Sequence, residues 1–307
     1  MACYAGNQAF PYGICQGVVG FRPGRSAGLP VRLPLPCALT FAQCRSFKAS
    51  LLRVVSLSVV IITFNEAANI ARCLQALADV ADDVLVVDSF STDATVDICR
   101  QHGARVIQHA FAGYVEQKNY ATAQARFDHV LQLDADEVLT HELRQSIRAA
   151  KQDWQHAAYT LARRTNYCGH WVRHGGWYPD RKLRLYDRRL GRWTGLLLHE
   201  RYEVAAGQTT GQLIGDTLHY SYYSIAQHVS QLNKFTSIAA QELALRGRPR
   251  VSLFHLLLKP LWKFVHGYVF RLGFLDGFAG LCIAGISAWG VFLKFAKLKT
   301  RTERAEA

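Results

Sequence analysis

Residues 56–65 read SLSVVIITFN, and the apolar, β-branched run from Ser56 to Thr63 predicts a buried strand. Similar runs predict further strands over residues 83–88, 105–109 and 129–134. Helices are expected in the intervals, the first capped by Asn65 and the others over residues 92–103 and 113–125. Strand and helix thus alternate four times, which is the pattern of a mostly parallel, Rossmann-like sheet with helices on both faces. The predicted fold class is α/β.

Polar residues follow three of these strands where each strand ends. They are Thr63 and Asn65 after the first strand, Asp88 after the second, and Asp134, Asp136 and Glu137 after the fourth. A ligand of a parallel sheet binds outside the carboxyl ends of its strands. We therefore expect these side chains to meet at one rim, although they are far apart in the sequence.

The loop after the first strand argues against the common nucleotide-binding motifs. It reads TFNEAAN (63–69), which contains neither GxGxxG nor GxxxxGK[ST], and this disfavours dehydrogenases and P-loop enzymes. An acidic rim can face a phosphorylated ligand only through a divalent cation, and carboxylate oxygens suit Mg²⁺ or Mn²⁺. If the chain turns after the fourth strand, one of Asp134 and Asp136 can bind the metal while the other accepts from a ribose hydroxyl.

Three blocks, in this order, resemble the family 2 glycosyltransferases of the GT-A fold: VVIITFNEAANIARCL (59–74), VVDSFSTDAT (86–95) and QLDADE (132–137). The resemblance implies a UDP-sugar donor whose uracil and ribose lie among Thr63, Asn65 and Asp88, with Ser91 and Asp93 supporting that loop. It also implies a DxD motif of Asp134 and Asp136, in which Asp136 is the metal ligand. We add Glu66, from the first loop, to the residues expected to bind the nucleotide sugar.

Two further blocks are similar to the subgroup that adds β-glucose to a heptose of the lipopolysaccharide inner core. They are WYPDRKLRLYDRR (177–189) and WTGLLLHERYEV (193–204), and the match extends to GFLDG (273–277). The resemblance covers roughly residues 56–300. It implies transfer of a hexose, glucose in that subgroup, to a lipid-linked saccharide, although transferases with other acceptors share these blocks.

Inverting transfer needs a base for the acceptor hydroxyl and a cation for the departing diphosphate. Glu200 is the candidate base, with a surface glutamate as the alternative. Arg184 is the candidate cation, on a strand whose alternation puts Leu183 and Leu185 on the opposite face; a solvated basic edge strand is the alternative. His219 is expected to complete the metal site, although a lone histidine between apolar residues is more often a core residue.

The net charge of +13 divides the chain into three parts. Residues 1–53 carry +6 and residues 246–307 carry +8, which leaves −1 for the residues between them. Five of the eight prolines lie in residues 1–53, which we expect to be poorly ordered. A GT-A domain over 54–223 and a helical, basic, membrane-interface region over 224–307 are expected to follow.

Residues 253–273 interleave cations with aromatic and aliphatic residues, as LFHLLLKPLWKFVHGYVFRLG. This composition is typical of a helix lying in a membrane interface, and a packed helical subdomain is the alternative. Residues 277–293 carry no charge, but their glycines disfavour a helix, which predicts a shallow or re-entrant segment rather than a full span. The basic residues that follow would face anionic headgroups.

The eight cysteines are scattered without CxxC or zinc-ligand spacing, which indicates a reducing compartment. We therefore expect a cytoplasmic protein, peripheral on the inner face of the cell membrane. The near-neutral central part argues against a nucleic-acid partner. Two alternatives remain open: a basic protein that binds nucleic acid, and a scaffold that binds nucleotide sugars without catalysis.

Overall fold

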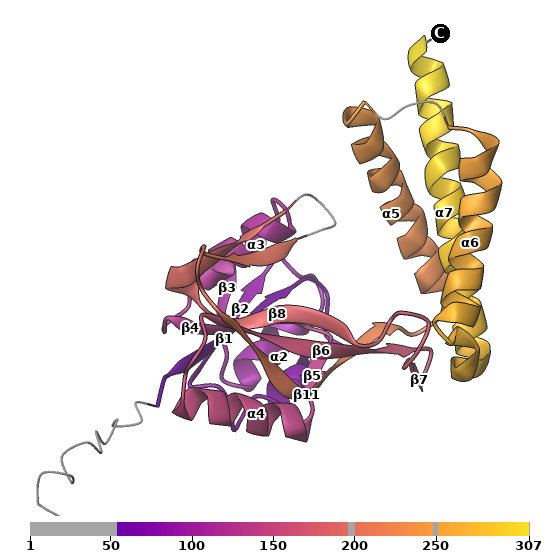
Figure 1. Ribbon diagram of the computed structural model, residues 1–307. Helices are drawn as coiled ribbons and strands as arrows, with labels where there is room; N and C mark the ends of the chain where they lie inside the picture. Colours follow the sequence, from indigo (N-terminus) through magenta and orange to yellow (C-terminus); the bar gives the residue numbers. More distant parts are fainter. Residues whose placement is uncertain (1–53, 196–199, 248–250, 307) are drawn as a thin grey trace, which may run out of the picture. The chain divides into compact units, whose positions relative to one another are not determined.

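The computed structural model describes residues 54–195, 200–247 and 251–306. The expectation for residues 1–53 lies outside this part of the chain. The first four strands are neighbours in one parallel array, in the order β3-β2-β1-β4 (Figure 1). Their bounds agree with the predicted strands: β1 (Leu57–Thr63), β2 (Asp83–Asp88), β3 (Arg105–Gln108) and β4 (His129–Asp134). The helices between them are α1 (Ile70–Gln75), α2 (Thr95–Gln101) and α3 (Tyr114–Ala123).

The sheet continues beyond β4 as a mixed array in the order β8-β6-β11-β5, with β7 paired to β6. These elements are β5 (Glu137–Leu139), β6 (Ala158–Tyr167), β7 (His170–Trp171), β8 (Asp180–Asp187) and β11 (Thr210–Tyr222), and helix α4 (His141–Gln152) follows β5. Strand β8 runs antiparallel to both of its neighbours. A separate hairpin pairs β9 (Gly191–Thr194) with β10 (Arg201–Val204).

Side chains of β1 alternate between two cores, one on each face of the sheet. Leu57, Val59 and Ile61 pack in one core with apolar residues of α1, α2 and α4. Val60 packs in the other, with Ala121 of α3 and aromatic residues of β8, β9 and β10. Because both faces are covered, β1 is apolar from Val59 to Ile62, and the predicted α/β architecture is confirmed.

Helices α5, α6 and α7 follow the sheet. Helix α5 (Ile225–Leu245) begins at a capping box in which Ser224 and Gln227 exchange hydrogen bonds. Its buried residues are His228, Thr236 and Ala240, whereas Ile225, Val229 and Phe235 are about two-fifths exposed. Helix α6 (Lys259–Val265) lies between two π-helical turns, Phe254–Leu258 and His266–Phe270, and α7 spans Gly277–Glu306.

Helix α7 runs unbroken through its glycines, although the sequence predicts that they disfavour a helix. A Cβ at Gly290 would lie 2.6 Å from Leu232 Cδ1 of α5, and one at Gly280 would collide with the carbonyl oxygen of Gly273. These glycines therefore allow close packing that a side chain would prevent. The segment Gly273–Arg301 is long and apolar enough to cross a membrane, as judged by length and composition only.

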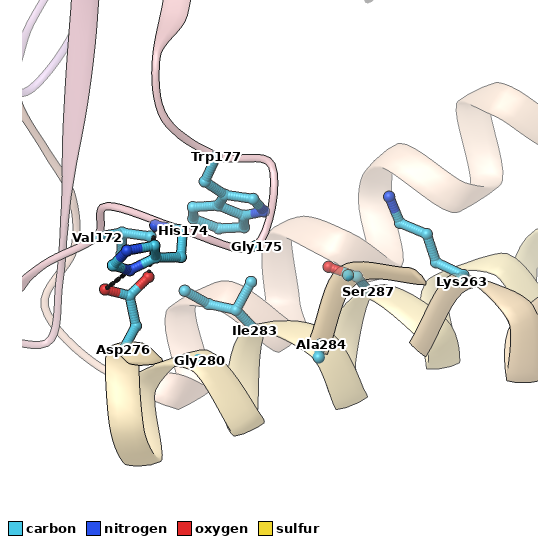
Figure 2. Close-up of a pocket in the computed structure, with 11 residues that line it drawn as sticks. Val172, His174, Gly175, Trp177, Lys263, Asp276, Gly280, Ile283, Ala284 and Ser287 are labelled. Atoms are coloured by element: carbon cyan, nitrogen blue, oxygen red, sulfur yellow. Dashed lines mark hydrogen bonds and ion pairs between the residues drawn. The ribbon is translucent and has the colours of Figure 1, made fainter. Parts of the chain in front are cut away.

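Asp276, just before α7, joins the helices to the loop after β7. Its buried carboxylate accepts from the backbone N–H groups of Arg173 and His174 and faces the ring of His170. It also faces the ring of His174 (Figure 2). Hydrogen bonds from these groups outweigh the cost of burial and hold the pKa of Asp276 below its usual value. The GFLDG block therefore has a structural role in this fold.

Candidate active site

A cleft of about 1280 Å³ opens at the carboxyl ends of β1 and β4. Strand β8 and the hairpin β9–β10 form its opposite wall, and α3, α5 and β11 also contribute to its lining. Seven of the predicted site residues line this cleft: Thr63, Glu66, Asp134, Asp136, Arg184, Glu200 and His219. The structure therefore brings together residues from the start of the sheet and from its last strand.

The loops after β1 and β2 are cross-linked by their own polar side chains. The backbone N–H of Asn65 donates to Ser91 Oγ at 2.8 Å, and Asn65 Oδ1 accepts from the N–H of Thr92 at 2.8 Å. Asn65 has a φ of 54°, so it lies in a left-handed turn. The expectation that Asn65 caps the first helix is wrong, because α1 begins five residues later. The Asn65 side chain instead accepts a hydrogen bond from the loop after β2.

The same cross-links fix Asp88 and Asp93. Asp88 is fully buried and accepts from both the N–H and the hydroxyl of Ser91. Asp93 accepts from Thr95 and from the N–H of Ala67, while Glu66 binds Asn69 Nδ2 through its carboxylate at 2.7 Å. Burial raises the pKa of Glu66, against the opposing effect of the Asn69 hydrogen bond. These contacts hold the two loops in a fixed shape at one end of the cleft.

Asp134 lies among cations. Arg184 Nη2 donates to its carboxylate at 2.8 Å, and Lys118 Nζ lies 3.7 Å from the other oxygen. Burial alone would raise the pKa of Asp134, but the charges of Arg184, Lys118 and Arg163 outweigh it and hold that pKa well below its usual value. Asp134 is therefore an anion that accepts hydrogen bonds at any physiological pH.

Asp136 pairs with His219, which β11 brings from the far end of the sheet. His219 Nε2 lies 3.1 Å from Asp136 Oδ2, and Ser221 Oγ lies 2.6 Å from His219 Nδ1. Burial would lower the pKa of His219, but the hydrogen bond and charge of Asp136 raise it overall. No cluster of three or more His, Cys, Asp or Glu side chains suited to a metal occurs in the described parts of the chain.

Arg184 enters the cleft through an irregularity in β8. Leu185 pairs with Tyr159 but Leu183 pairs with Thr160, so Arg184 is an extra residue between them. This bulge breaks the alternation: Leu185 packs in one core and Leu183 against the other, and the prediction that they share a face is wrong. The Arg184 side chain is buried, and its Nη1 has no hydrogen-bond partner within the described structure.

Glu200 faces the same cleft from the segment before β10. Its carboxylate lies 3.1 Å from Lys118 Nζ, and one-quarter of the side chain is exposed. Glu137 is different, because it is buried and accepts from the backbone N–H of Asp134 at 3.1 Å. His199 and the three residues before it lie outside the described part of the chain.

Sequence reasoning missed Lys118, Arg163 and Trp193, all of which line the cleft. Lys118 lies on α3, where Gln117 and Thr122 are also buried. The sequence of residues 113–125 has no apolar stripe. A helix of this composition that packs on the sheet must bury polar side chains, and this signal could have pointed to Lys118. Arg163 was visible only as part of a locally basic segment, and its partners Asp180 and Glu137 come from other strands.

Comparison with known proteins identifies the family. Residues 58–209 match the model of glycosyl transferase family 2. An uncharacterized glycosyltransferase of Rickettsia typhi is 32% identical over 253 residues, which are 79% of this chain and 86% of that protein. The chain belongs to glycosyltransferase family 2. This glycosyltransferase is an enzyme with the predicted GT-A type of α/β fold.

Two further comparisons are more distant. The lipopolysaccharide core biosynthesis glycosyltransferase LpsC of Rhizobium meliloti is 29% identical to this glycosyltransferase over 260 residues, 80% of this chain and 92% of LpsC. Among solved structures, residues 1–349 of TarS from S. aureus, in complex with UDP-GlcNAc, give a TM-score of 0.42 with 14% identity, covering 82% of this chain and 91% of that one.

Proposed function

We propose that this glycosyltransferase moves a hexose from a UDP-sugar, with inversion, to a saccharide acceptor that is held at the membrane by a lipid. One observation carries the proposal: a single cleft is bordered by four side chains of the required kinds, Asp134, Asp136, Arg184 and Glu200. Displacement at an anomeric carbon needs a base for the incoming hydroxyl and positive charge for the leaving diphosphate. The cleft offers both.

The nucleoside would lie against the cross-linked loops after β1 and β2. Asp88, fixed by Ser91, is placed to accept from uracil or ribose, with Asn65 and Asp93 maintaining the loop. Thr63 Oγ1 is buried and has no hydrogen-bond partner among the described residues, so it is free to bind a ligand atom. Asp134 would accept from a ribose hydroxyl.

Asp136 and His219 would hold Mg²⁺ or Mn²⁺. A carboxylate oxygen and an imidazole nitrogen 3.1 Å apart fit such an ion, and the positions they leave open suit diphosphate oxygens and water. When bound, the ion would neutralise charge on the diphosphate. Arg184 also lines the cleft and would add a second positive charge; its Nη1 has no hydrogen-bond partner within the described structure.

Glu200 would act as the catalytic base. It would take the proton of the acceptor hydroxyl while that oxygen bonds to the anomeric carbon, and the bond to the diphosphate oxygen would break with its electron pair leaving on UDP. Glu137 is less suited, because its buried carboxylate already accepts from the N–H of Asp134.

We further propose that the acceptor is a lipopolysaccharide inner-core saccharide and that the sugar is glucose. The likeness to LpsC, whose name assigns it to lipopolysaccharide core biosynthesis, supports the acceptor class. The blocks at residues 177–189 and 193–204 support a heptose acceptor by their resemblance to the glucose-adding subgroup.

The helices after β11 would bind the inner face of the cell membrane. Large apolar side chains of this region are at least half exposed, including Leu257, Leu261, Trp262, Phe270 and Phe278. The cations Lys263 and Arg271 lie among them and are exposed, whereas Asp276, the only acid between residues 246 and 302, is buried. An apolar surface whose cations have no ion-pair partner among the described residues matches an anionic bilayer, where each cation contributes about 1 kcal/mol.

Turnover of a panel of UDP-sugars on heptose-containing core lipid, read by mass spectrometry of the product, tests the donor and the acceptor together. We expect a mass increase of one hexose with UDP-glucose. Calorimetry with UDP, with and without Mn²⁺, separates an enzyme of this kind from a protein that does not bind nucleotide sugars. Absence of UDP binding under both conditions would refute the proposed donor.

A further inference from the structure

Three consecutive residues of α3 each reach a different segment of the cleft. Gln117 Nε2 donates to Ser89 Oγ at 3.1 Å, in the loop after β2. Lys118 Nζ lies between Asp134 and Glu200. Asn119 donates to the carbonyl of Trp193 at 2.9 Å and accepts from its N–H at 3.0 Å. A single turn of helix therefore connects the donor end of the cleft with the acceptor end.

Asn119 contacts Trp193 of β9, and Lys118 contacts Glu200 just before β10. The Asn119 side chain forms both hydrogen bonds that a neighbouring strand would form with the backbone of Trp193, and so holds β9 against α3. Lys118 is 1% exposed; its ammonium contacts Glu200 at 3.1 Å and lies 4.7 Å from the centre of the Trp193 ring. Within the described structure Glu200 has no other ion-pair partner, so Lys118 determines where its carboxylate lies.

We propose that Lys118 is a positioning residue that holds Glu200 in place to accept the proton of the acceptor. This inference rests on the proposed function, because it assigns a partner to the proposed base. The ammonium is buried and its neighbours are two carboxylates and an indole ring, so it can be displaced only at the cost of leaving a charge unpaired. Glu200 is therefore held before the acceptor binds.

Lys118→Met in the full chain removes the charge but keeps the length of the side chain. We expect kcat for UDP-glucose on heptose-containing core lipid to fall about 10- to 100-fold, which is typical of a misplaced catalytic group. The KM for UDP-glucose and the UDP affinity in calorimetry should change less than twofold. Lys118→Gln, which keeps a donor for Glu200, should recover part of the rate.

The double variant gives the sharpest test. If Lys118 acts through Glu200, then Lys118→Met combined with Glu200→Gln should be no slower than Glu200→Gln alone. If the two substitutions instead reduced kcat independently, so that the double variant lost the product of the two single reductions, the inference would be wrong. Lys151→Met is the matched control, because Lys151 is also buried and paired with Asp82 at 2.6 Å, but lies outside the cleft; it should lower the melting temperature without lowering kcat.

UDP affinity distinguishes this inference from the proposed function. A loss of tenfold or more in Lys118→Met, with the wild type still binding UDP, would mean that Lys118 contacts the donor, and the positioning role would be wrong. This measurement needs no acceptor, so it tests the inference even if the core lipid is not the substrate. Failure of the wild type to bind UDP would instead refute the proposed donor.

Discussion

His219 Nε2 lies 3.1 Å from Asp136 Oδ2, although the two residues come from the last strand of the sheet and from the loop after β4. Strand β11 pairs with β5 so that His219 is opposite Glu137, and this register brings the ring to the DxD turn. Among the described residues, His219 is the side chain that forms an ion pair with Asp136, so the pair offers one nitrogen and one oxygen ligand. The first prediction follows from it.

Asp136→Ala should lower the rate of transfer at least about 10²-fold, because the diphosphate would lose its counter-ion during departure. The melting temperature should stay close to that of the wild type. Asp97→Ala is the control, since Asp97 is an exposed residue of α2 paired only with Arg100. Full activity of the wild type in EDTA would contradict the metal assignment.

Glu200→Gln should keep UDP affinity but lose on the order of 10² to 10⁴ in kcat, because the amide preserves the shape and cannot take a proton. Glu203→Gln is the matched control on the neighbouring strand, where the exposed carboxylate pairs with Arg201. We expect the control to retain the wild-type rate. A rate within threefold of wild type in Glu200→Gln would direct the search for the base to Asp180 or Glu137.

Two glycines of α7 should respond in opposite ways to alanine. Gly280→Ala should destabilise the protein, because its Cβ would meet the backbone of Gly273, which cannot move freely. Nothing lies within 4 Å of a Cβ at Gly285, so Gly285→Ala should stabilise the helix by up to about 1 kcal/mol. Thermal unfolding of both variants measures the difference, and equal shifts would show that α7 packs differently.

The stability of the protein should fall as the pH is lowered from 7 to 5. Burial lowers the pKa of His228 to about 4, below the value of about 6.5 expected in the unfolded chain. Neutral His228 is compatible with the folded state, so its full contribution to the free energy of unfolding is present above pH of about 6.5. Because the unfolded chain takes up a proton more readily, this contribution is lost as the pH falls from about 6.5 towards 4. The loss between pH 7 and pH 5 is about 2 kcal/mol. Denaturant unfolding of His228→Gln should show a weaker pH dependence in this range.

Replacing Leu261 and Trp262 together with asparagine should reduce binding to vesicles that contain anionic phospholipid. Both side chains are about three-fifths exposed, so the fold should tolerate the change. Ile214→Asn on β11, also exposed, is the control and should leave vesicle binding unchanged. Co-sedimentation measures the bound fraction, and unaltered binding of the double variant would argue against this membrane-facing surface.

The sequence by itself determined the first half of the sheet and the residues at its rim. Strands β1, β2 and β4 are buried on both faces, so their mostly apolar runs record the local structure directly. Asp88 and Asp134 follow from the same pattern, because a polar residue at the end of such a strand must lie at the carboxyl rim. Ser224 and Gln227 form a capping box, a local sequence pattern that indicates where α5 begins.

Only the tertiary structure decided how the second half completes the cleft. The bulge that aims Arg184 inward depends on pairing between β8 and β6, and no local property of residues 180–187 specifies that register. Lys118 is buried because Asp134, Glu200 and Trp193 supply partners from distant segments, whereas its own helix has no apolar face to predict burial. Gly280 and Gly290 of α7, unfavourable in an isolated helix, are accommodated because Gly273 and Leu232 pack against them. Long-range contacts override local propensity at these positions.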